Sequence, residues 1–136
     1  ELEISEPMGN YGIKVSENNK IFIATGSGLA PFIPMIKSLK EKILLIYGIK
    51  NYDEDLSQIF LSEVSNLEVI RCISDENIKI TNLNDINSRV TSYLKDNDLD
   101  WKNSDFYICG RNEMIVQVSE ILENKGVKNI YKENYG

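Results

Sequence analysis

The chain has 136 residues, of which 42% are hydrophobic and 26% are charged, values that suit one globular domain with a sizeable core. Its formal net charge of −6 argues against nucleic acid or an anionic membrane surface as a partner, because either requires a basic face. No stretch resembles a transmembrane span or a secretory signal. The two cysteines, Cys72 and Cys109, form no CxxC pair, so we expect no structural metal, no disulfide framework and a reducing cytoplasm.

The first fifteen residues alternate apolar and polar positions on either side of a turn region at residues 7–10. This pattern is typical of two short strands. The chain begins directly in that pattern, so we expect it to belong to a longer protein or to lean on another domain.

Residues 21–39 (IFIATGSGLAPFIPMIKSL) predict a strand, a glycine turn and a helix opened by Pro31. Glycines allow a tight turn and a close backbone approach, while the first N–H groups of a helix have no internal partner. This arrangement suits an anion, most often a phosphate. A tight turn without any ligand is equally compatible with the spacing.

Three other interpretations of the glycine turn fail on the residues themselves. A GxxxxGK[ST] phosphate loop requires a lysine where Leu29 stands, and the GxGxxG dinucleotide fingerprint requires a glycine where Pro31 stands. The next strand also ends in Lys50 rather than in an acid that would bind a ribose. A serine nucleophile requires a histidine partner, and the chain contains no histidine.

The remaining sequence alternates strand-like and helix-like patterns. Short apolar runs predict further strands at residues 43–48, 67–73, 105–109 and 127–131. Helical spacing predicts helices over residues 53–64, from a cap at Asp85 through Leu94, and from about Asn112 to Gly126. We therefore expect an α/β fold with a five-stranded parallel sheet and helices on both faces. In such a sheet ligands bind beyond the carboxyl ends of the strands, so residues 25–28, 48–51, 74–75 and 109–111 should share one rim.

Five segments in this order resemble the pyridine-nucleotide domain of the ferredoxin–NADP⁺ reductase family: ATGSGLAPF (24–32), LLIYGIKNYDEDL (44–56), SRVTSYL (88–94), FYICGRNEM (106–114) and YKENY (131–135). The segment SEPMGNYG (5–12) resembles the GPxGxF strand that ends the family's FAD-binding barrel. The resemblance therefore implies a strand remnant of the barrel with its linker at residues 1–18, and a nucleotide-binding domain at residues 19–136.

The resemblance implies a flavoprotein reductase in which NAD(P)H delivers hydride to FAD, which passes electrons to an acceptor. The barrel's RxY[ST] motif is absent, so FAD would require a domain missing from this chain, in cis or on another subunit. The chain would then hold the nucleotide and be inactive alone, with the acceptor a protein or a small molecule. Two alternatives remain: a non-catalytic nucleotide-binding or regulatory module, and a flavodoxin-like domain without a nucleotide, against which the closing residues and the Cys109–Gly110 turn argue.

By resemblance, the glycine turn serves the nucleotide. Thr25, Gly26, Ser27 and Gly28 would lie under the pyrophosphate and the nicotinamide, and Gly48 would let the adenosine side approach the second strand. Plain turn residues and an ordinary strand-ending glycine are the alternative.

The FYICGRNEM segment matches the family's CGPPxM motif. Cys109 corresponds to the cysteine beside the nicotinamide ring, where a neutral thiol aligns the ring rather than acting as a nucleophile. Gly110, Arg111 and Met114 are expected to contact the nucleotide. Arg111 and Asn112 replace the two prolines, so Arg111 is also available to a phosphate or an acceptor.

The last residues match the family's closing acid–x–aromatic pattern. Tyr135 would cover the flavin ring until the nicotinamide displaces it, and Glu133 would belong to the proton or acceptor chemistry. Gly136 follows, so the aromatic residue is not terminal. A solvated tail is the alternative.

Nucleotide choice depends on the end of the third strand. Ser74 is followed by Asp75, where members that use NADP place an arginine for the 2′-phosphate. A carboxylate accepts hydrogen bonds from ribose hydroxyls and repels a phosphate, so Asp75 favours NADH. Lys79 is close enough in sequence to weaken that preference.

Overall fold

The structure, a computed structural model, describes residues 3–4 and 18–134, and it is built on one parallel sheet. The sheet has seven strands, in the spatial order β1 (Glu3–Ile4), β7 (Asn129–Asn134), β6 (Ser104–Gly110), β2 (Asn19–Thr25), β3 (Ile43–Ile49), β4 (Leu67–Ile73) and β5 (Asp85–Ile86). The central strands are almost entirely buried, as expected for a sheet covered on both faces.

The predicted α/β fold with parallel strands is confirmed, and each of the five predicted strands is present within a few residues of its expected bounds. Two short strands extend the sheet. β1 pairs with β7 at one edge, and β5 pairs with β4 at the other. The remaining residues predicted to form short strands, 5–15, lie outside the described residues.

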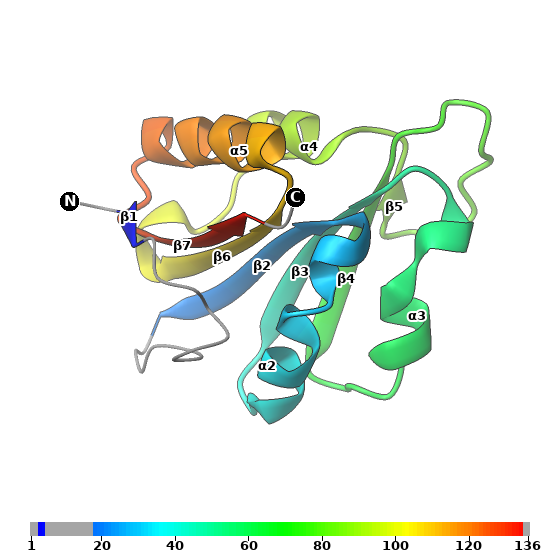
Figure 1. The fold of residues 1–136 in the computed structure, drawn as a ribbon, viewed down its shortest axis with the longest axis horizontal. Coiled ribbons are helices and arrows are strands. Elements are labelled where there is room, and N and C mark those ends of the chain that lie inside the picture. The colour runs from blue at the N-terminus through cyan, green and yellow to red at the C-terminus, as the bar shows by residue number, and fades with distance from the viewer. Residues whose placement is uncertain (1–2, 5–17, 135–136) are drawn as a thin grey trace.

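Helices cover both faces of the sheet, as predicted (Figure 1). α2 (Phe32–Ser38) and α3 (Leu56–Phe60) lie on one face, and α4 (Val90–Asp96) and α5 (Asn112–Asn124) lie on the other. The described part of the chain also contains three 3₁₀ turns: η1 (Gly26–Leu29), η2 (Tyr52–Glu54) and η3 (Trp101–Asn103). A buried apolar cluster separates the sheet from each pair of helices.

The helix predicted over residues 53–64 is shorter than its apolar spacing indicates. It is divided into η2 and the five-residue α3 by Asp55, whose carboxylate accepts hydrogen bonds from the Ser57 and Gln58 N–H groups. A cap of this kind satisfies the orphan N–H groups of the new helix and fixes its start.

The prediction that Asp85 caps the following helix is wrong. Asp85 lies in β5, and α4 begins only at Val90, with Arg89 in the cap position. The Asp85 carboxylate is buried and accepts hydrogen bonds from the Tyr52 hydroxyl at 2.6 Å and the Arg71 guanidinium at 3.5 Å. A partly buried arginine requires a counter-charge, and that tertiary demand overrides the local capping preference.

The predicted end of the last helix at Gly126 is confirmed. Gly126 has φ +88°, and its N–H donates to the Glu123 carbonyl while the Val127 N–H donates to the Leu122 carbonyl. These two bonds form a Schellman motif, which requires a left-handed residue that glycine adopts without strain.

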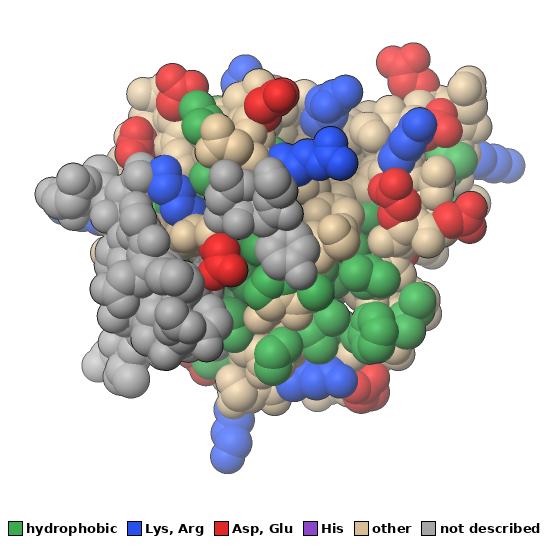
Figure 2. All heavy atoms as spheres, viewed as in Figure 1, with side chains coloured by type: hydrophobic (Ala, Val, Ile, Leu, Met, Phe, Trp, Pro, Cys, Tyr) green, Lys and Arg blue, Asp and Glu red, His purple; other side chains and the backbone are tan. Residues whose placement is uncertain are grey.

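No helix among the described residues is long and apolar enough to cross a membrane. Figure 2 shows hydrophobic side chains gathered over α2 and α3 on the face in view. Of the hydrophobic residues in α3, Ile59 and Phe60 are exposed.

Candidate functional site

The carboxyl ends of the strands border an open cavity at the point where the strand order reverses. From β2 the chain proceeds through β3 to β4 and β5 on one side, then returns to β6 on the other side of β2. A cavity of about 950 Å³ lies across these strand ends, and it is lined by residues 25–28, 48–50, 54, 56, 72, 74, 89–91, 110, 111, 113, 114 and 117. Its place and size are typical of a cofactor site in an open α/β sheet.

The glycine turn forms one wall of the cavity. The turn is η1, a 3₁₀ turn. α2 begins at Phe32 with Pro31 in the cap position, so the helix predicted to open at Pro31 is present. Gly26 has φ +52°, and a Cβ placed there would meet no atom within 4 Å, so the backbone is open on that side. A Cβ at Gly28 would lie 2.7 Å from the Cys109 carbonyl oxygen, which explains why the close contact of η1 with β6 requires glycine.

Two further glycines, Gly48 and Gly110, allow neighbouring side chains to pack closely against the strand ends. A Cβ at Gly48 would lie 2.8 Å from the Val90 Cγ2 and 2.9 Å from the Thr25 Cγ2, so its absence lets α4 and the glycine turn approach β3. A Cβ at Gly110 would clash with the Met114 methyl group. All of these residues line the cavity, among them Thr25, Gly48, Gly110 and Met114, which the family resemblance assigns to the nucleotide.

The charges on the cavity wall contrast with the acidity of the chain. Three cations, Lys50, Arg89 and Arg111, and two acids, Glu54 and Glu113, line it, which gives a balance of +1 against −6 for the whole chain. The Glu54 carboxylate accepts a hydrogen bond at 2.8 Å from the Lys50 backbone N–H. Such a wall favours a ligand that carries negative charge.

Of the two residues predicted to bind the nucleotide at the end of the third strand, only one lines the cavity. Ser74 is part of the wall, whereas Asp75 lies beside it and its Oδ1 accepts a hydrogen bond from the Asn77 N–H. The Asn87 amide donates to the Ile73 and Asp75 carbonyls at 2.8 and 2.9 Å. These bonds hold the loop after β4 at the edge of the cavity.

Cys109 and Glu133 are brought together on adjacent strands, below the rim rather than in the cavity wall. Cys109 is fully buried in the core on the α2 face and pairs in register with Glu133. Burial, reinforced by the Glu133 charge, raises the pKa of the Cys109 thiol to about 12. The thiol is therefore protonated at neutral pH and is not a nucleophile. Tyr135 lies outside the described residues.

Several residues on the cavity wall were not predicted as site residues. Arg89 is the cap of α4 and Thr91 lies in its first turn, inside a segment quoted for the family resemblance. Gln117 lies one turn after Glu113 on α5. Cys72 pairs in register with Gly48, so the register of β3 and β4 places it at the rim. The spacing of apolar residues does not predict which residues at the starts of different helices meet at the cavity, because that depends on how the helices pack.

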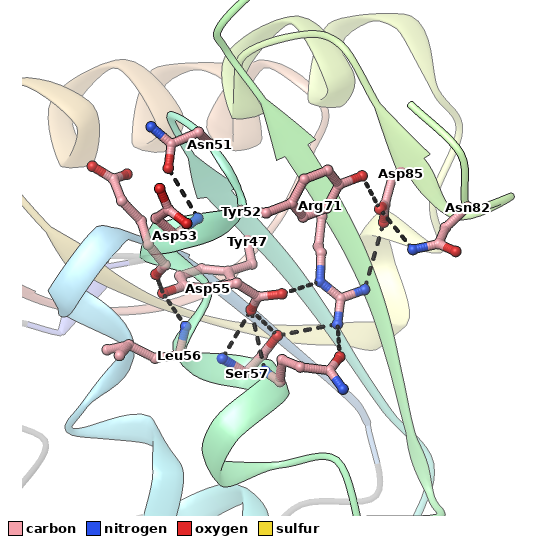
Figure 3. Close-up of polar contacts among 12 residues, drawn as sticks. Tyr47, Asn51, Tyr52, Asp53, Asp55, Leu56, Ser57, Arg71, Asn82 and Asp85 are labelled. Carbon is pink, nitrogen blue, oxygen red and sulfur yellow. Dashed lines mark hydrogen bonds and ion pairs between the residues drawn. The ribbon is translucent and has the colours of Figure 1, made fainter. Parts of the chain in front are cut away.

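Charged side chains connect the cavity wall formed by η2 and α3 to the sheet (Figure 3). The Arg71 guanidinium lies between two buried carboxylates, 2.6 Å from the Asp55 Oδ2 and 3.5 Å from the Asp85 Oδ1. Asp55 caps α3, and Asp85 also accepts from Tyr52 of η2. The three charges therefore join the η2 and α3 turns to β4 and β5. We refer to Asp55, Arg71 and Asp85 as the arginine cluster.

Comparison with known proteins agrees with this architecture. A family model for the oxidoreductase NAD-binding domain matches residues 22–120. The electron transfer component of toluate 1,2-dioxygenase from Pseudomonas putida is 25% identical, with 98% of this chain and 42% of that protein covered. One component of the Na⁺-translocating NADH-quinone reductase from Yersinia pestis is 29% identical, with 98% of this chain and 36% of that protein covered. The chain thus spans roughly two fifths of the length of these relatives.

Solved structures share the fold. The FAD/NAD-binding domain of a nitric oxide dioxygenase from Vibrio cholerae superposes with a TM-score of 0.73 at 20% identity, covering 91% of this chain and 54% of that one. A ferredoxin–NADP⁺ reductase from Neisseria gonorrhoeae superposes with a TM-score of 0.69 at 22% identity, covering 86% and 56%. Together with the sequence matches, these similarities confirm the resemblance noted from the sequence motifs.

Proposed function

Since the chain belongs to the oxidoreductase NAD-binding domain family, we propose that it is the pyridine-nucleotide half of a flavin-dependent reductase. In this proposal the chain binds NAD(P)H, which supplies a hydride, and an FAD-binding domain on the same polypeptide or another subunit receives it. The named relatives include an electron transfer component of a dioxygenase and a component of a quinone reductase. An electron acceptor downstream of the flavin is therefore part of the proposal.

One observation carries this proposal: the cavity at the reversal of strand order combines an open glycine turn with a positively charged wall. The turn offers backbone N–H groups that have no partner within it, because the first N–H groups of any helical turn lack one. Lys50, Arg89 and Arg111 add positive charge around it. Both features suit the pyrophosphate of a dinucleotide.

The proposed roles follow the positions of the residues. Thr25–Gly28 would hold the pyrophosphate, and Gly110, Met114 and Arg111 would contact the nicotinamide half from the side of α5. Gly48 and Ser74 line the part of the wall proposed for the adenosine half. The protonated Cys109 thiol would form apolar packing beneath the nicotinamide, and Glu133 and Tyr135 are proposed to serve the flavin side.

NADH is the proposed nucleotide. Asp75 lies beside Ser74 at the edge of the cavity, and one of its oxygens is committed to the Asn77 N–H. A carboxylate there accepts hydrogen bonds from ribose hydroxyls and repels a 2′-phosphate. The name of the Yersinia pestis relative also specifies NADH. Asp75→Ser is expected to improve NADPH binding relative to NADH.

Residues 1–18 are proposed to form the end of the FAD-binding barrel and its linker, with residues 19–136 as the nucleotide domain. Glu3–Ile4 pairs with β7, so part of the first segment packs on the nucleotide domain. The proposed compartment is the cytoplasm, as expected for a chain whose two cysteines are both free thiols.

A nucleotide titration of this chain followed by NMR tests the proposal. NADH is expected to shift the backbone amides of residues 25–28, 74–75 and 109–111, and NADPH is expected to shift them less at equal concentration. Arg89→Gln should raise the NADH dissociation constant about tenfold at low ionic strength, because each charge-assisted contact to a phosphate contributes on the order of 1.5 kcal/mol. Added salt should shrink that difference.

Lys102→Gln is the matched control, because it removes the same charge from an exposed position in η3, away from the cavity wall. It should bind NADH like the wild type. If millimolar NADH and NADPH leave all three groups of amides unchanged, the binding proposal for the isolated chain is wrong. If the chain binds the nucleotide but the complete protein transfers no hydride to FAD, the regulatory alternative replaces the reductase.

A further inference from the structure

A buried tyrosine hydroxyl contacts residues from two parts of the cavity wall, the glycine turn and the start of α3. Figure 3 shows Tyr47 beside Leu56. Tyr47 of β3 is fully buried, and its hydroxyl lies 2.7 Å from the Gly26 carbonyl oxygen in the glycine turn. The same oxygen lies 3.1 Å from the Glu54 carbonyl and 3.4 Å from the Leu56 N–H, at the junction of η2 and α3. Gly26, Glu54 and Leu56 all line the cavity, whereas Tyr47 itself does not.

The Tyr47 hydroxyl has one proton to donate, and the distances indicate which carbonyl oxygen accepts it. The Gly26 carbonyl is the nearest acceptor, with the Glu54 carbonyl as a weaker competitor, and the Leu56 N–H donates back to the hydroxyl oxygen. Burial raises the pKa of Tyr47 to about 12, so the proton is present throughout the physiological range.

The hydrogen bond to Gly26 fixes a peptide group that faces the cavity. Gly26 is in the left-handed region at φ +52°, a conformation in which its carbonyl orientation is not imposed by a regular helix or strand. The C=O of Gly26 and the N–H of Ser27 belong to one trans peptide, so they point in opposite directions. When the carbonyl is held toward Tyr47 in the core, the Ser27 N–H is directed away from the core, and Ser27 is an exposed lining residue.

Charged side chains join the Glu54 and Leu56 side of the Tyr47 contact to the sheet. Asp55 lies between Glu54 and Leu56, is buried, and is held by Arg71 at 2.6 Å. The arginine cluster thereby joins the residues that meet the Tyr47 hydroxyl to β4 and β5. The Gly26 carbonyl is thus held against a fixed part of the fold.

We propose that Tyr47 is a positioning residue of the nucleotide site, whose hydroxyl orients the Gly26–Ser27 peptide so that the Ser27 N–H binds the pyrophosphate. This inference rests on the proposed function, because it assumes a phosphate-bearing ligand in the cavity. In this proposal the conformation of the glycine turn depends on a hydrogen bond from the core as well as on the residues of the turn.

Tyr47→Phe tests the inference, because phenylalanine fills the same volume and removes only the hydroxyl. The dissociation constants of NADH and ADP-ribose are expected to rise about tenfold, since one oriented hydrogen bond to a charged group is lost. Adenosine, which lacks the phosphates, is expected to bind within about twofold of wild type. In an amide spectrum, the Ser27 signal is expected to lose most of the shift that ADP-ribose induces in the wild type.

Tyr131→Phe is the matched control. Tyr131 lies in the same apolar cluster, on β7, and is not part of the cavity wall. It should leave all three dissociation constants unchanged, and urea unfolding of both variants establishes that each is folded.

The outcomes separate this inference from the function on which it rests. If wild-type protein binds neither NADH nor ADP-ribose, the proposed function fails and this inference with it. If wild type binds them and Tyr47→Phe binds NADH equally well, the positioning role alone is wrong. If Tyr47→Phe weakens adenosine as much as NADH, the hydroxyl stabilises the fold generally, and the positioning role is again overturned.

Discussion

Strands β2 and β6 bury paired charges at their amino ends, whereas their carboxyl ends leave the backbone open to a cavity. At the amino ends, Lys20 is 2% exposed and Asp105 is fully buried, and the Lys20 ammonium lies 3.4 Å from the Asp105 carboxylate. The other Asp105 oxygen accepts hydrogen bonds of 3.0 Å from the Asn18 and Asn129 side chains. At the carboxyl ends, glycines and a threonine replace charged side chains, and the backbone opens into the cavity.

The amino ends of these strands therefore contribute mainly to stability, and their carboxyl ends contribute mainly to ligand binding. Buried charges persist only when each has a partner, so the amino end is closed by contacts within the protein. The carboxyl end leaves space and positive charge beside a backbone turn, which is the arrangement required for an external anion. Substitutions at the two ends should therefore change different measured quantities.

The largest effect is expected at the closed end. Asp105→Ala leaves the Lys20 ammonium buried beside a lost partner, so the free energy of unfolding should fall by about 3–5 kcal/mol. Urea unfolding measures this loss, and the affinity of the remaining folded protein for NADH should not change. The double variant Lys20→Met with Asp105→Leu should recover part of the stability, because an apolar pair needs no counter-charge, whereas the Asn18 and Asn129 amides still lose their shared acceptor. A large change in affinity in the folded single variant would contradict the separation.

A smaller loss of stability but a larger loss of binding is expected at the open end. Gly28→Ala would place a Cβ 2.7 Å from the Cys109 carbonyl, where neither backbone segment yields easily, so η1 must shift. We expect about 1–3 kcal/mol less stability and at least about tenfold weaker NADH binding, measured by urea unfolding and calorimetry.

Gly126→Ala is the matched control for that substitution. Its φ of +88° is unfavourable for alanine, but a Cβ there meets no atom within 4 Å and the residue lies outside the cavity wall. It should lose about 1 kcal/mol of stability and bind NADH normally. Equal affinities for the Gly28 and Gly126 variants would show that the contact of η1 with β6 does not matter for binding.

At neutral pH the smallest effect is expected from the two buried thiols, whose contribution to stability changes only at alkaline pH. Burial raises the pKa of Cys72 and of Cys109 to about 12, from an ordinary value of 9.0. Because the folded state holds these protons more tightly, the stabilisation is complete below pH 9 and is lost as pH rises toward 12. Between pH 9 and 10 each thiol should lower the free energy of unfolding by about 1.4 kcal/mol per pH unit or less.

Urea unfolding at pH 8, 9 and 10 measures this loss. The variant with both Cys72→Ala and Cys109→Ala should show a flatter profile over the same range, although its stability at pH 8 is lower because two buried side chains are truncated. An identical slope in the variant would assign the alkaline loss to other groups.

The sequence by itself determined the order of elements, the parallel sheet with helices on both faces, and most of the rim. Continuous apolar runs predict buried strands, and the glycine turn and Gly126 predict chain reversals, because each of these signals acts within a few residues. The family motifs and the strand-end rule also brought Thr25, Gly48, Ser74 and Gly110 to one place, and the structure confirms that they share the cavity wall.

Only the tertiary structure decided which side chains meet across the sheet. Asp85 was expected to cap a helix, but it lies in β5 because the Arg71 guanidinium on β4 needs its charge. Likewise, the contact of Tyr47 with Gly26 joins residues 21 positions apart, and Arg89 reaches the cavity only because α4 packs beside β3. Periodicity specifies the face on which a residue lies, whereas its partner depends on packing between elements distant in sequence.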